Sequence, residues 1–541
     1  MTKRQLIALG ALSALTLSAC GGGGGNGEDT ADTAEPGNAD NVVEDGTLVL
    51  GIHEDPGNLF RSLNNSATLS QVFPIAYESP VWYDETGEPQ PWLAESWDES
   101  PTHVEWTIRE GVMCPDGSEL DAELVADNYR WILDPDNGST SVGTVVPPDA
   151  EVEHDNEART VTVTTGTADS FLLAQIGIHP IVCHGALEDP ESIATDTDGT
   201  GLFELVEAVP GDHYTFERKD DYDWPREGAP DGQTPGVPKT LEVRIVENPS
   251  TRANMLLAGD LNIASVQGPD EPRVAEAVDV LMQQDRINAG IAYSQAEGMP
   301  GEDEDVRVAL TKALDIEALT QVNTSGEGEV PTRLATLEPE VCQYNSVSEN
   351  TPSYDPDEAG AMLDAAGWTR DGDELRSRDG EELVLDFAWT TRWPENAATA
   401  EMMTDMWAEI GVGVNHEGGD HGAWTENVFS EGASDHYEVM WIGLNHFVPG
   451  ALGGYLSGEL PPAGNNFAAI DNEEFATALE EAEELSGADA CDAWEQAEAA
   501  LYSSGDMVLL AMQPDATYSQ GVQASLNPSW TTTAALLLTE D

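Results

Sequence analysis

The sequence predicts a mixed α/β fold for this chain of 541 residues. Short runs with an apolar residue at every second position are typical of half-buried strands. Other stretches begin with helix-capping residues and continue with apolar residues at helical spacing. Strands and helices are mixed along the whole chain, and no repeat of about 20 to 50 residues interrupts them, which argues against a solenoid.

The strands are expected at four places. The folded part begins at residues 47–52, Thr-Leu-Val-Leu-Gly-Ile, the first strand-like run. Alternating apolar residues predict three more strands. These pass through Val104, Trp106 and Ile108, through Val161 and Val163, and through Leu241, Val243 and Ile245.

Three helices are predicted from their ends and their apolar faces. Asp355 can cap a helix with Pro356 in its first turn, and Gly367 can end that helix after Met362 and Leu363. Residues 471–474 have a spacing like that of a capping box, and the apolar face that follows consists of Phe475, Leu479, Ala482 and Leu485. A third apolar stripe stops at Gly411 and consists of Ala400, Met403, Trp407 and Ile410.

The N-terminus has the features of an export signal. Lys3 and Arg4 precede an uncharged, mostly apolar run at residues 6–17, which is too short to span a bilayer. The next residues, Leu17-Ser18-Ala19-Cys20, resemble a lipobox, in which the chain is cut before the cysteine and the sulfur is lipidated. We therefore expect a signal peptide at residues 1–19 and a lipid anchor on Cys20, at the outer face of a membrane. The alternative is an ordinary secretory signal with an incidental cysteine.

The segment after Cys20 is expected to be a flexible tether. Residues 21–25 are all glycine, and a polar, acidic stretch continues to about residue 45. This composition cannot bury enough apolar surface to offset the entropy of ordering. We therefore assign residues 20–45 to the tether.

The charge of the chain is strongly acidic. There are 21 Lys and Arg against 102 Asp and Glu, and loss of Lys3 and Arg4 with the signal peptide takes the formal net charge from −81 to −83. Such a charge opposes compaction in dilute buffer, but at molar salt the Debye length falls to about 3 Å. Because the acids are spread over every segment, we favour adaptation to a salty medium over steering of a cationic ligand. Nucleic acid binding is disfavoured.

Four cysteines remain after Cys20, and they allow three pairings: Cys114, Cys183, Cys342 and Cys491. An even number in an exported chain favours disulfides over free thiols. No C-x-x-C spacing occurs, so neither a zinc site nor a redox motif is indicated.

Seven segments, covering nearly the whole mature chain, carry motifs that occur together in one family. They are residues 91–97 (PWLAESW), 109–117 (REGVMCPDG), 198–203 (DGTGLF), 248–264, 305–315, 354–368 and 407–412. In this order they resemble the family-5 extracellular solute-binding proteins of ABC importers, the peptide- and nickel-binding group. One departure is Leu202, which stands where the family usually has proline.

The resemblance implies a two-lobe clamp, like that of periplasmic binding proteins, that closes on its ligand by hinge motion. It also implies an extra subdomain in lobe I and a hinge near residues 292–295 and near residue 500. The expected parts are lobe I (46–80, 196–290 and 500–541), its extra subdomain (81–195) and lobe II (291–499). Under this division Cys114 would pair with Cys183 and Cys342 with Cys491, since each pair then stays within one part.

The resemblance also indicates where a ligand would bind. Peptide-binding members hold the peptide's ammonium with an aspartate after a GW-x-x-D strand, and residues 440–445 correspond to it here. Trp441 is retained, as a pocket wall or as a core residue, but Leu444 follows Gly443 at the aspartate position. Asn445 could act as a weaker, neutral acceptor. If the register differs, the carboxylate could come from Asp435, Glu438 or Glu459.

Further candidate ligand-binding residues lie on loops, and each is open to the alternative of ordinary packing. They are Trp389, Arg392 and Trp393 of one loop, Asn65 and Ser66 of lobe I, and Trp424 and His446. No H-x-x-x-H arrangement supports a nickel site, and we expect no metal and no cofactor.

The implied role is that of a monomeric receptor that delivers a small polar solute to the permease of an ABC importer. A short peptide is the first candidate; an oligosaccharide, an opine or a metal chelate is the alternative. A surface-anchored hydrolase has no support, because G-x-S-x-G, P-loop and H-E-x-x-H motifs are all missing.

Overall fold

The computed structural model of the protein describes residues 42–541, apart from 65, 67, 85, 338–339, 373, 394, 462–463, 525–535 and 539–541. The predicted signal peptide, Cys20, nearly all of the predicted tether and Asn65 therefore lie outside the described residues. Among the helices of the described part, none is long and apolar enough to cross a membrane.

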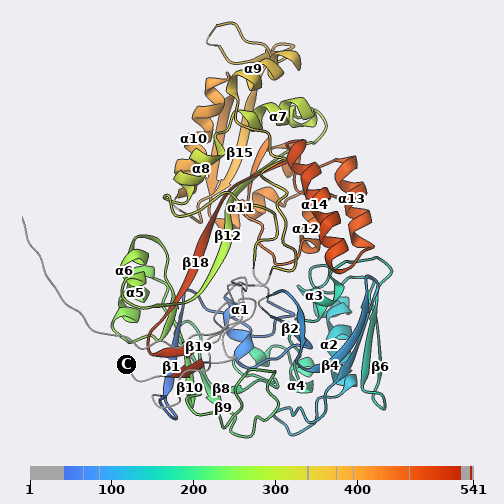
Figure 1. Cartoon of the computed structure of the whole chain (residues 1–541), viewed down its shortest axis with the longest axis vertical. Helices are drawn as coiled ribbons and strands as arrows, with labels where there is room; N and C mark the ends of the chain where they lie inside the picture. Colours follow the sequence, from blue (N-terminus) through green and yellow to red (C-terminus); the bar gives the residue numbers. More distant parts are fainter. Residues whose placement is uncertain are drawn as a thin grey trace, which may run out of the picture. The chain divides into compact units, whose positions relative to one another are not determined.

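The largest sheet of the described part has ten strands, in the order β16-β15-β17-β12-β18-β11-β1-β10-β9-β8 (Figure 1). Its lobe I strands are β1 (Thr47–Ile52), β8 (Phe203–Val209), β9 (His213–Arg218), β10 (Thr240–Ile245) and β11 (Ile263–Ser265). Its lobe II strands are β15 (Val384–Thr390), β16 (Gly413–Gly419) and β17 (Val439–Ile442). Strand β1 is parallel to both of its neighbours, β10 and β11, and β15 is parallel to both β16 and β17.

Two long strands connect the lobes, β12 (Asp279–Tyr293) and β18 (Met507–Ser519). They pair antiparallel along their length, from Asp279 with Ser519 to Ala292 with Met507. Strand β18 pairs with β11 on the lobe I side, and β12 pairs with β17 on the lobe II side. The segments that we expected at the hinge, near residues 292–295 and 500, lie at the lobe II end of β12 and inside helix α14 (Gly487–Ser503).

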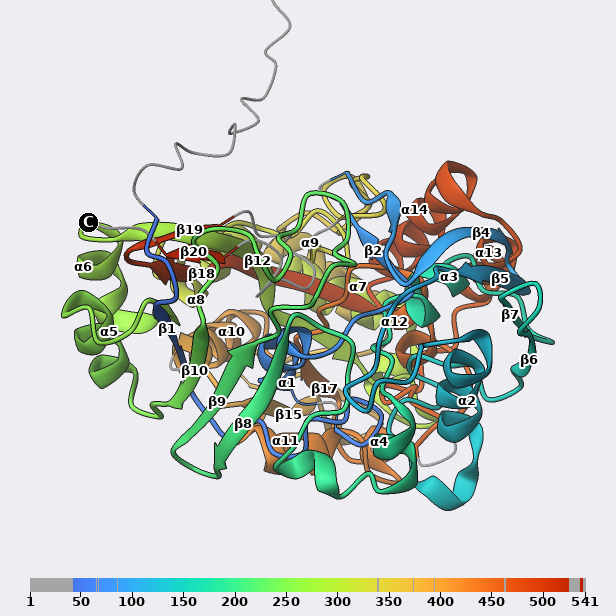
Figure 2. The ribbon, with the colours of Figure 1, turned by 90° about the horizontal axis from the view of Figure 1, so that it is seen from below.

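The extra subdomain of lobe I has a sheet of its own, in the order β4-β5-β7-β6. Its elements are β4 (Ala94–Ser100), β5 (His103–Ile108), β6 (Glu151–Asp155), β7 (Thr160–Thr164), α2 (Ala122–Leu133), α3 (Leu172–Ile176) and α4 (His184–Glu188). A small hairpin precedes it, made of β2 (Val81–Tyr83) and β3 (Pro89–Pro91). This subdomain lies on the opposite side of lobe I from α5 (Pro249–Leu257) and α6 (Glu271–Ala275), as two views agree (Figures 1 and 2).

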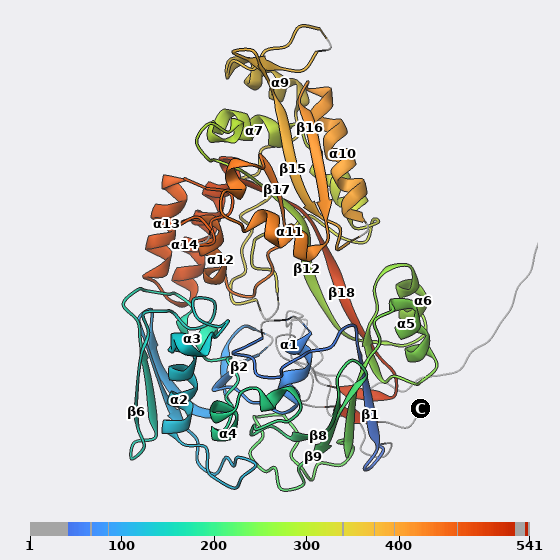
Figure 3. The ribbon, with the colours of Figure 1, turned by 180° about the vertical axis from the view of Figure 1, so that it is seen from behind.

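Helices cover the lobe II strands (Figure 3). They are α7 (Glu304–Lys312), α8 (Ile316–Asn323), α9 (Pro356–Ala365), α10 (Glu395–Glu409) and α11 (His421–Val428). Trp407 of α10 is fully buried, and its indole N–H donates to the carbonyl of Leu310 at 3.0 Å. The remaining short elements are α1 (Leu69–Val72), β13 (Ser377–Arg378), β14 (Glu381–Glu382), β19 (Val522–Ala524) and β20 (Leu536–Leu538).

Three later helices do not pack where our predicted domain boundaries put them. They are α12 (Gly450–Leu456), α13 (Glu473–Glu483) and α14 (Gly487–Ser503). We placed them in lobe II, yet Phe475 and Trp494 belong to the same hydrophobic cluster as Ile52 of lobe I and Trp106 of the extra subdomain. The separate lobe II core contains Trp407 and Trp441. Apolar contact therefore joins these helices to lobe I and its extra subdomain. Just before α12, the ring of Phe447 lies 6.1 Å from that of Tyr83 in β2.

The predicted elements are found at the expected places. Asp355 caps α9 by accepting the N–H of Glu358 at 2.9 Å, and Gly367 has φ +89° just after that helix. Helix α13 begins one residue later than the capping-box spacing suggested, because Asn472 is the cap. The prediction that Leu485 belongs to its buried face is wrong: α13 ends at Glu483, and Leu485 is exposed.

Both predicted disulfides are confirmed. Cys114 is bonded to Cys183, with Cα atoms 6.1 Å apart, and Cys342 is bonded to Cys491, with Cα atoms 5.3 Å apart. The first bond lies within the extra subdomain. The second fastens the long segment before α9 to helix α14.

Two carboxyl groups meet where the extra subdomain contacts α13. The hydroxyl of Ser170 donates to the carbonyl of Ala482, next to Glu483. Burial, Asp169 and Glu480 raise the pKa of Glu483 to about 7, and burial raises the pKa of Asp169, which accepts from the amide of Gln175 at 2.5 Å. This contact is therefore disfavoured when both carboxyls are ionised.

We predict that Glu483→Gln stabilises the protein at about pH 8.5 and has no effect at about pH 5. A carboxyl whose pKa is raised in the folded state contributes least above that pKa, so stability falls as pH rises from the ordinary value of 4.5 to about 7. The glutamine variant lacks this loss. Thermal unfolding at the two pH values measures it, with Glu484→Gln as an exposed control. Equal melting temperatures for wild type and Glu483→Gln at pH 8.5 contradict the prediction.

Candidate functional site

Charged side chains from both lobes approach one another near the connecting strands. Six residues, which we call the interlobe cluster, interact electrostatically with one another: His53, Glu54, Arg252, Arg286, Arg392 and Asp515. His53 and Glu54 follow β1, and Arg392 follows β15. Both strands are parallel to their neighbours, and the carboxyl ends of such strands are the usual place for ligands in open α/β sheets.

Burial and repulsion between the cationic groups lower the pKa values of His53 and Arg392 in this cluster. Burial lowers the pKa of His53, and Arg252 and Arg392 lower it further against the opposing effect of Glu54. Arg392 is exposed to solvent, yet the surrounding protein and Arg286 lower the pKa of its guanidinium. His53 is therefore biased toward the neutral form, and the net local charge comes mainly from the three arginines.

Two of these arginines are engaged within the protein. Arg252 donates from Nε to the carbonyl of Ser265 at 2.8 Å and from Nη1 to that of Val246 at 2.7 Å. Arg286 lies with Nε 3.2 Å from Oδ2 of Asp515 on the paired strand. Arg252 therefore stabilises lobe I, and Arg286 stabilises the pairing of the two connecting strands.

Arg392 differs from both. Within the described part of the chain, its guanidinium makes no ion pair and no hydrogen bond, and it lies 5.4 Å from the ring centroid of Trp393. Because 102 acids are present in the chain, an arginine that has none of the described acids as a partner is unusual. It is the cation of this cluster that can bind an anionic group of a ligand.

The structure places Trp441 in the core, the second of the two roles considered for it. Its side chain is 1% exposed, its N–H donates to the carbonyl of Asn288 at 3.1 Å, and it stacks on Phe387. Trp389 is similar, being 8% exposed and donating to Nδ1 of His416 at 3.2 Å. Both tryptophans stabilise lobe II and support the loops that follow their strands.

Asn445 is also occupied by the protein. Its Oδ1 accepts the N–H of Ile287 at 2.9 Å, and its Nδ2 donates to the carbonyl of Ile287 at 3.0 Å. The side-chain amide thus bonds the backbone of β12 as a backbone peptide group would, and it extends the pairing of β17 with β12. Gly443 is exposed and Leu444 is half-buried, so this segment reaches the surface next to Asn445.

The other candidates are spread over several elements. Ser66 accepts the N–H of Leu69 with its hydroxyl at 3.1 Å and so begins helix α1. Glu438 accepts the N–H of Asp386 at 2.6 Å and lies at the far end of β17 from Leu444, while Asp435 and Glu459 are exposed. Of the predicted residues, Arg392 and Trp393 therefore join the charged cluster, and Leu444 and Asn445 lie on a separate segment.

Sequence reasoning missed several residues of this region. His53, Glu54, Arg286 and Asp515 were not predicted to take part. A signal for the first two existed, since they directly follow a strand that was predicted at residues 47–52. Arg286 and Asp515 had no such signal, because they lie inside the two connecting strands and meet through strand pairing.

Comparison with known protein families identifies the chain. Residues 88–458 match the family described as bacterial extracellular solute-binding proteins, family 5 Middle. Similar curated proteins include the nickel-binding periplasmic protein of Escherichia coli K12, 25% identical over 382 residues, which are 64% of this chain and 67% of that protein. The oligopeptide-binding protein AppA of Bacillus subtilis is 27% identical over 360 residues, 63% of each chain.

Solved structures show the same fold. A substrate-binding protein from Microbacterium hydrocarbonoxydans, complexed with 4-hydroxybenzoate hydrazide, superposes with TM-score 0.71 and 23% identity over 91% of this chain and 100% of that one. AppA of Bacillus subtilis, in complex with a nonapeptide, superposes with TM-score 0.68 and 18% identity over 92% and 100%. The fold is thus a two-lobe α/β clamp with an extra subdomain in lobe I. The chain belongs to family 5 of the bacterial extracellular solute-binding proteins.

Proposed function

We propose that this protein captures a short peptide between its lobes and delivers it to the permease of an ABC importer. Arg392 carries the proposal, because it is a cation on a lobe II loop that forms no ion pair with the described residues and lies close to the charged residues of lobe I. It fits the terminal carboxylate of a peptide. Peptide-binding relatives support this class of ligand. Other acidic small solutes, such as an opine or a metal chelate, are the alternative.

The proposal extends to the rest of the molecule. Lipidated Cys20 would hold a monomer at the outer face of the membrane, and residues 21–45 would give it reach to the permease. The transporter would supply the energy, so this chain needs neither nucleotide nor catalytic residues. A binding protein of this kind saturates at one ligand per chain and leaves the ligand unchanged.

The test of Arg392 compares two peptides that differ only at the C-terminus. Wild type is expected to bind Ala-Ala-Ala more tightly than its C-terminal amide, and Arg392→Gln is expected to weaken Ala-Ala-Ala about tenfold to a hundredfold, the range of a charge-assisted hydrogen bond. Isothermal titration calorimetry measures both. Arg378→Gln is the matched control, since Arg378 also lacks an ion pair in the described part of the chain and stacks on Trp368. Binding of neither peptide by wild type rules out the short-peptide proposal.

We also propose that the protein works in a salty medium. Lys and Arg form only 13 ion pairs in the described part of a chain with 102 acids, so most of the carboxylates there have no cationic partner. The melting temperature is expected to rise strongly between about 0.05 and 2 M KCl, as screening removes their repulsion. Sucrose at matched osmolality is the control. A flat response to salt contradicts this proposal.

A further inference from the structure

Arg61 is a second cation for which the described residues provide no acidic partner. It lies in the loop between β1 and α1, is half-buried, and donates from Nη1 to the carbonyl of Asn64 at 3.3 Å. None of the described carboxylates lies within ion-pair distance of it. The loop itself is fixed, because the Asn64 amide donates to the carbonyls of Pro56 at 2.6 Å and Asn58 at 2.9 Å. The guanidinium is therefore held by the Asn64 carbonyl, and no described residue acts as its counterion.

The groups around Arg61 come from three parts of the molecule and are neutral. His179 of the extra subdomain and His446 of lobe II both interact electrostatically with Arg61. Burial lowers the pKa of His179 to about 3 and that of His446 to about 4, with Arg61 adding to both effects. Ser62 lies 3.0 Å from Nε2 of His179, and Nδ1 of His446 accepts the N–H of Val448 at 3.2 Å. No neighbour among the described residues compensates the charge of Arg61.

The uncompensated charge of Arg61 lowers the stability of the fold unless another charged group neutralises it. Burial lowers the pKa of Arg61 to about 10, so the side chain is still protonated at neutral pH. A charge withdrawn from water without a partner destabilises the protein. In a chain with 102 acids and 21 cations, a carboxylate partner would be easy to supply. Its absence from the described surroundings of a half-buried arginine is what a site for an incoming anion requires.

The segment from Leu444 to His446 indicates which charge of a ligand Arg61 would face. By the family resemblance, Leu444 falls at the position at which peptide-binding members have an aspartate for the ligand's ammonium, and His446 follows two residues later. Among the described residues no carboxyl group is found to act on His446, whereas the positive charge of Arg61 from the opposite lobe does. The electrostatics of this end of the site are thus the reverse of those needed for a free ammonium.

We propose that Arg61 and the segment Leu444–His446 form an anion subsite, so that the ligand presents an acidic group where peptide-binding relatives receive an ammonium. Together with Arg392, this makes the preferred ligand a solute with two acidic groups. The inference rests on the proposed function, because it assigns the ligand class of the same site.

Three peptides with the same C-terminus test the subsite. N-succinyl-Ala-Ala, N-acetyl-Ala-Ala and Ala-Ala-Ala place a negative, a neutral and a positive group at the other end. Calorimetry on the wild type is expected to rank affinity in that order, with the succinyl peptide at least about tenfold tighter than the acetyl peptide. In Arg61→Gln this ratio should fall below about threefold, while Arg61→Lys and the control Arg378→Gln should keep a clear preference for the succinyl peptide.

The outcomes separate this inference from the proposed function. If wild type binds the probes but prefers Ala-Ala-Ala, or ranks all three equally, the anion subsite is wrong and the peptide role stands. A preference for the succinyl peptide that survives in Arg61→Gln also overturns it, because another cation is then responsible. If wild type binds none of the three, the peptide role itself is wrong and the inference falls with it. Because the wild-type ranking needs no variant, poor folding of Arg61→Gln does not prevent the test.

Discussion

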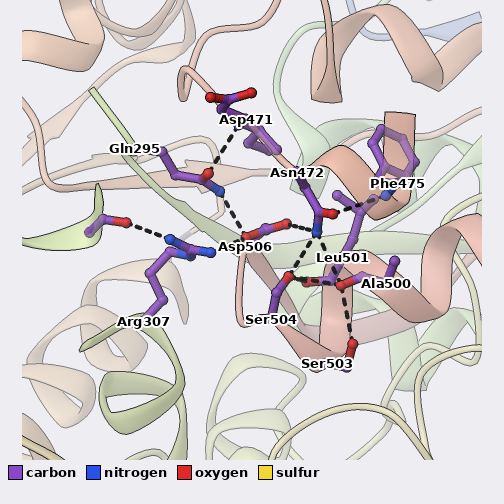
Figure 4. A network of polar contacts seen from close by, with 12 residues as sticks. Gln295, Arg307, Asp471, Asn472, Phe475, Ala500, Leu501, Ser503, Ser504 and Asp506 are labelled. Atoms are coloured by element: carbon purple, nitrogen blue, oxygen red, sulfur yellow. Dashed lines mark hydrogen bonds and ion pairs between the residues drawn. The ribbon is translucent and has the colours of Figure 1, made fainter. Parts of the chain in front are cut away.

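Replacement of Asp506 by alanine is expected to lower the free energy of unfolding by about 3–5 kcal/mol, the cost of leaving one partner of a buried ion pair alone. The Asp506 side chain is 0% exposed and that of Arg307 is 6% exposed, with Nη2 of Arg307 2.8 Å from Oδ1 of Asp506. Figure 4 shows the surrounding network. Gln295 donates to Oδ1 at 2.8 Å and Asn472 donates to Oδ2 at 2.7 Å.

The network joins four segments that are distant in the sequence. Arg307 belongs to α7, Gln295 follows β12, Asn472 caps α13, and Asp506 precedes β18. Alanine at residue 506 would leave the Arg307 guanidinium with only the carbonyls of Gly301 and Glu302 as acceptors, and it would remove one acceptor from the amide of Gln295 and one from the amide of Asn472. The pair therefore fastens the lobe II ends of both connecting strands to the neighbouring helices.

Chemical denaturation of Asp506→Ala measures the effect. The control is Asp127→Ala, which removes a partner of Arg130 from an exposed pair of side chains at 2.9 Å and should change stability by less than about 1 kcal/mol. Asp506→Asn keeps the shape of the side chain and isolates the charge. A loss below about 1 kcal/mol in Asp506→Ala would show that water or a rearranged neighbour replaces the carboxylate.

Removal of the Cys342–Cys491 bond is expected to cost about 5 kcal/mol. The bond closes a loop with a sequence separation of 149 residues, and the chain-entropy relation gives a destabilisation of about that size for such a loop. The Cys114–Cys183 bond closes 69 residues and should contribute about 4 kcal/mol. Both values reflect the wider freedom of the unfolded chain once the bond is absent, and neither depends on the packing of the folded chain.

The double variant Cys342→Ala/Cys491→Ala, compared with wild type in urea, measures the larger effect. Wild type under a strong reductant should approach the stability of a variant that lacks all four of these cysteines. A midpoint within the error of wild type for the double variant would contradict the prediction. The smaller effect of Cys114→Ala/Cys183→Ala provides an internal comparison of loop length.

Local structure was largely predictable because its causes are local. Asp355 and Gly367 bracket α9 through hydrogen bonds and a positive φ that depend only on nearby residues. The alternation of Val104, Trp106 and Ile108 follows from one face of β5 being buried. Leu485 shows the limit: its helical spacing was right, but α13 ends two residues earlier, so the side chain is left at the surface.

The candidate site was predicted only in part. Arg392 and Trp393 stood out as a loop that combines a cation with an aromatic ring, and they do join the charged cluster. Trp441 and Asn445 were singled out by their place in a motif, yet packing against Phe387 and hydrogen bonds to Ile287 occupy them. A motif indicates which strand lies near a ligand, but it does not show which side chains of that strand are free.

The order of residues alone gives the strongly acidic charge, the α/β class and, through the family's motifs, the clamp and its two disulfides; it also predicts an export signal. The composition also shows that cationic residues are few compared with acidic ones. Only the folded chain decides which of those cations lack a partner. Arg286 meets Asp515 through strand pairing, and Arg307 meets Asp506 between a helix and a strand, whereas Arg61 and Arg392 meet no carboxylate in the described part of the chain. Electrostatic pairing depends on distance in space, and long-range packing alone sets those distances.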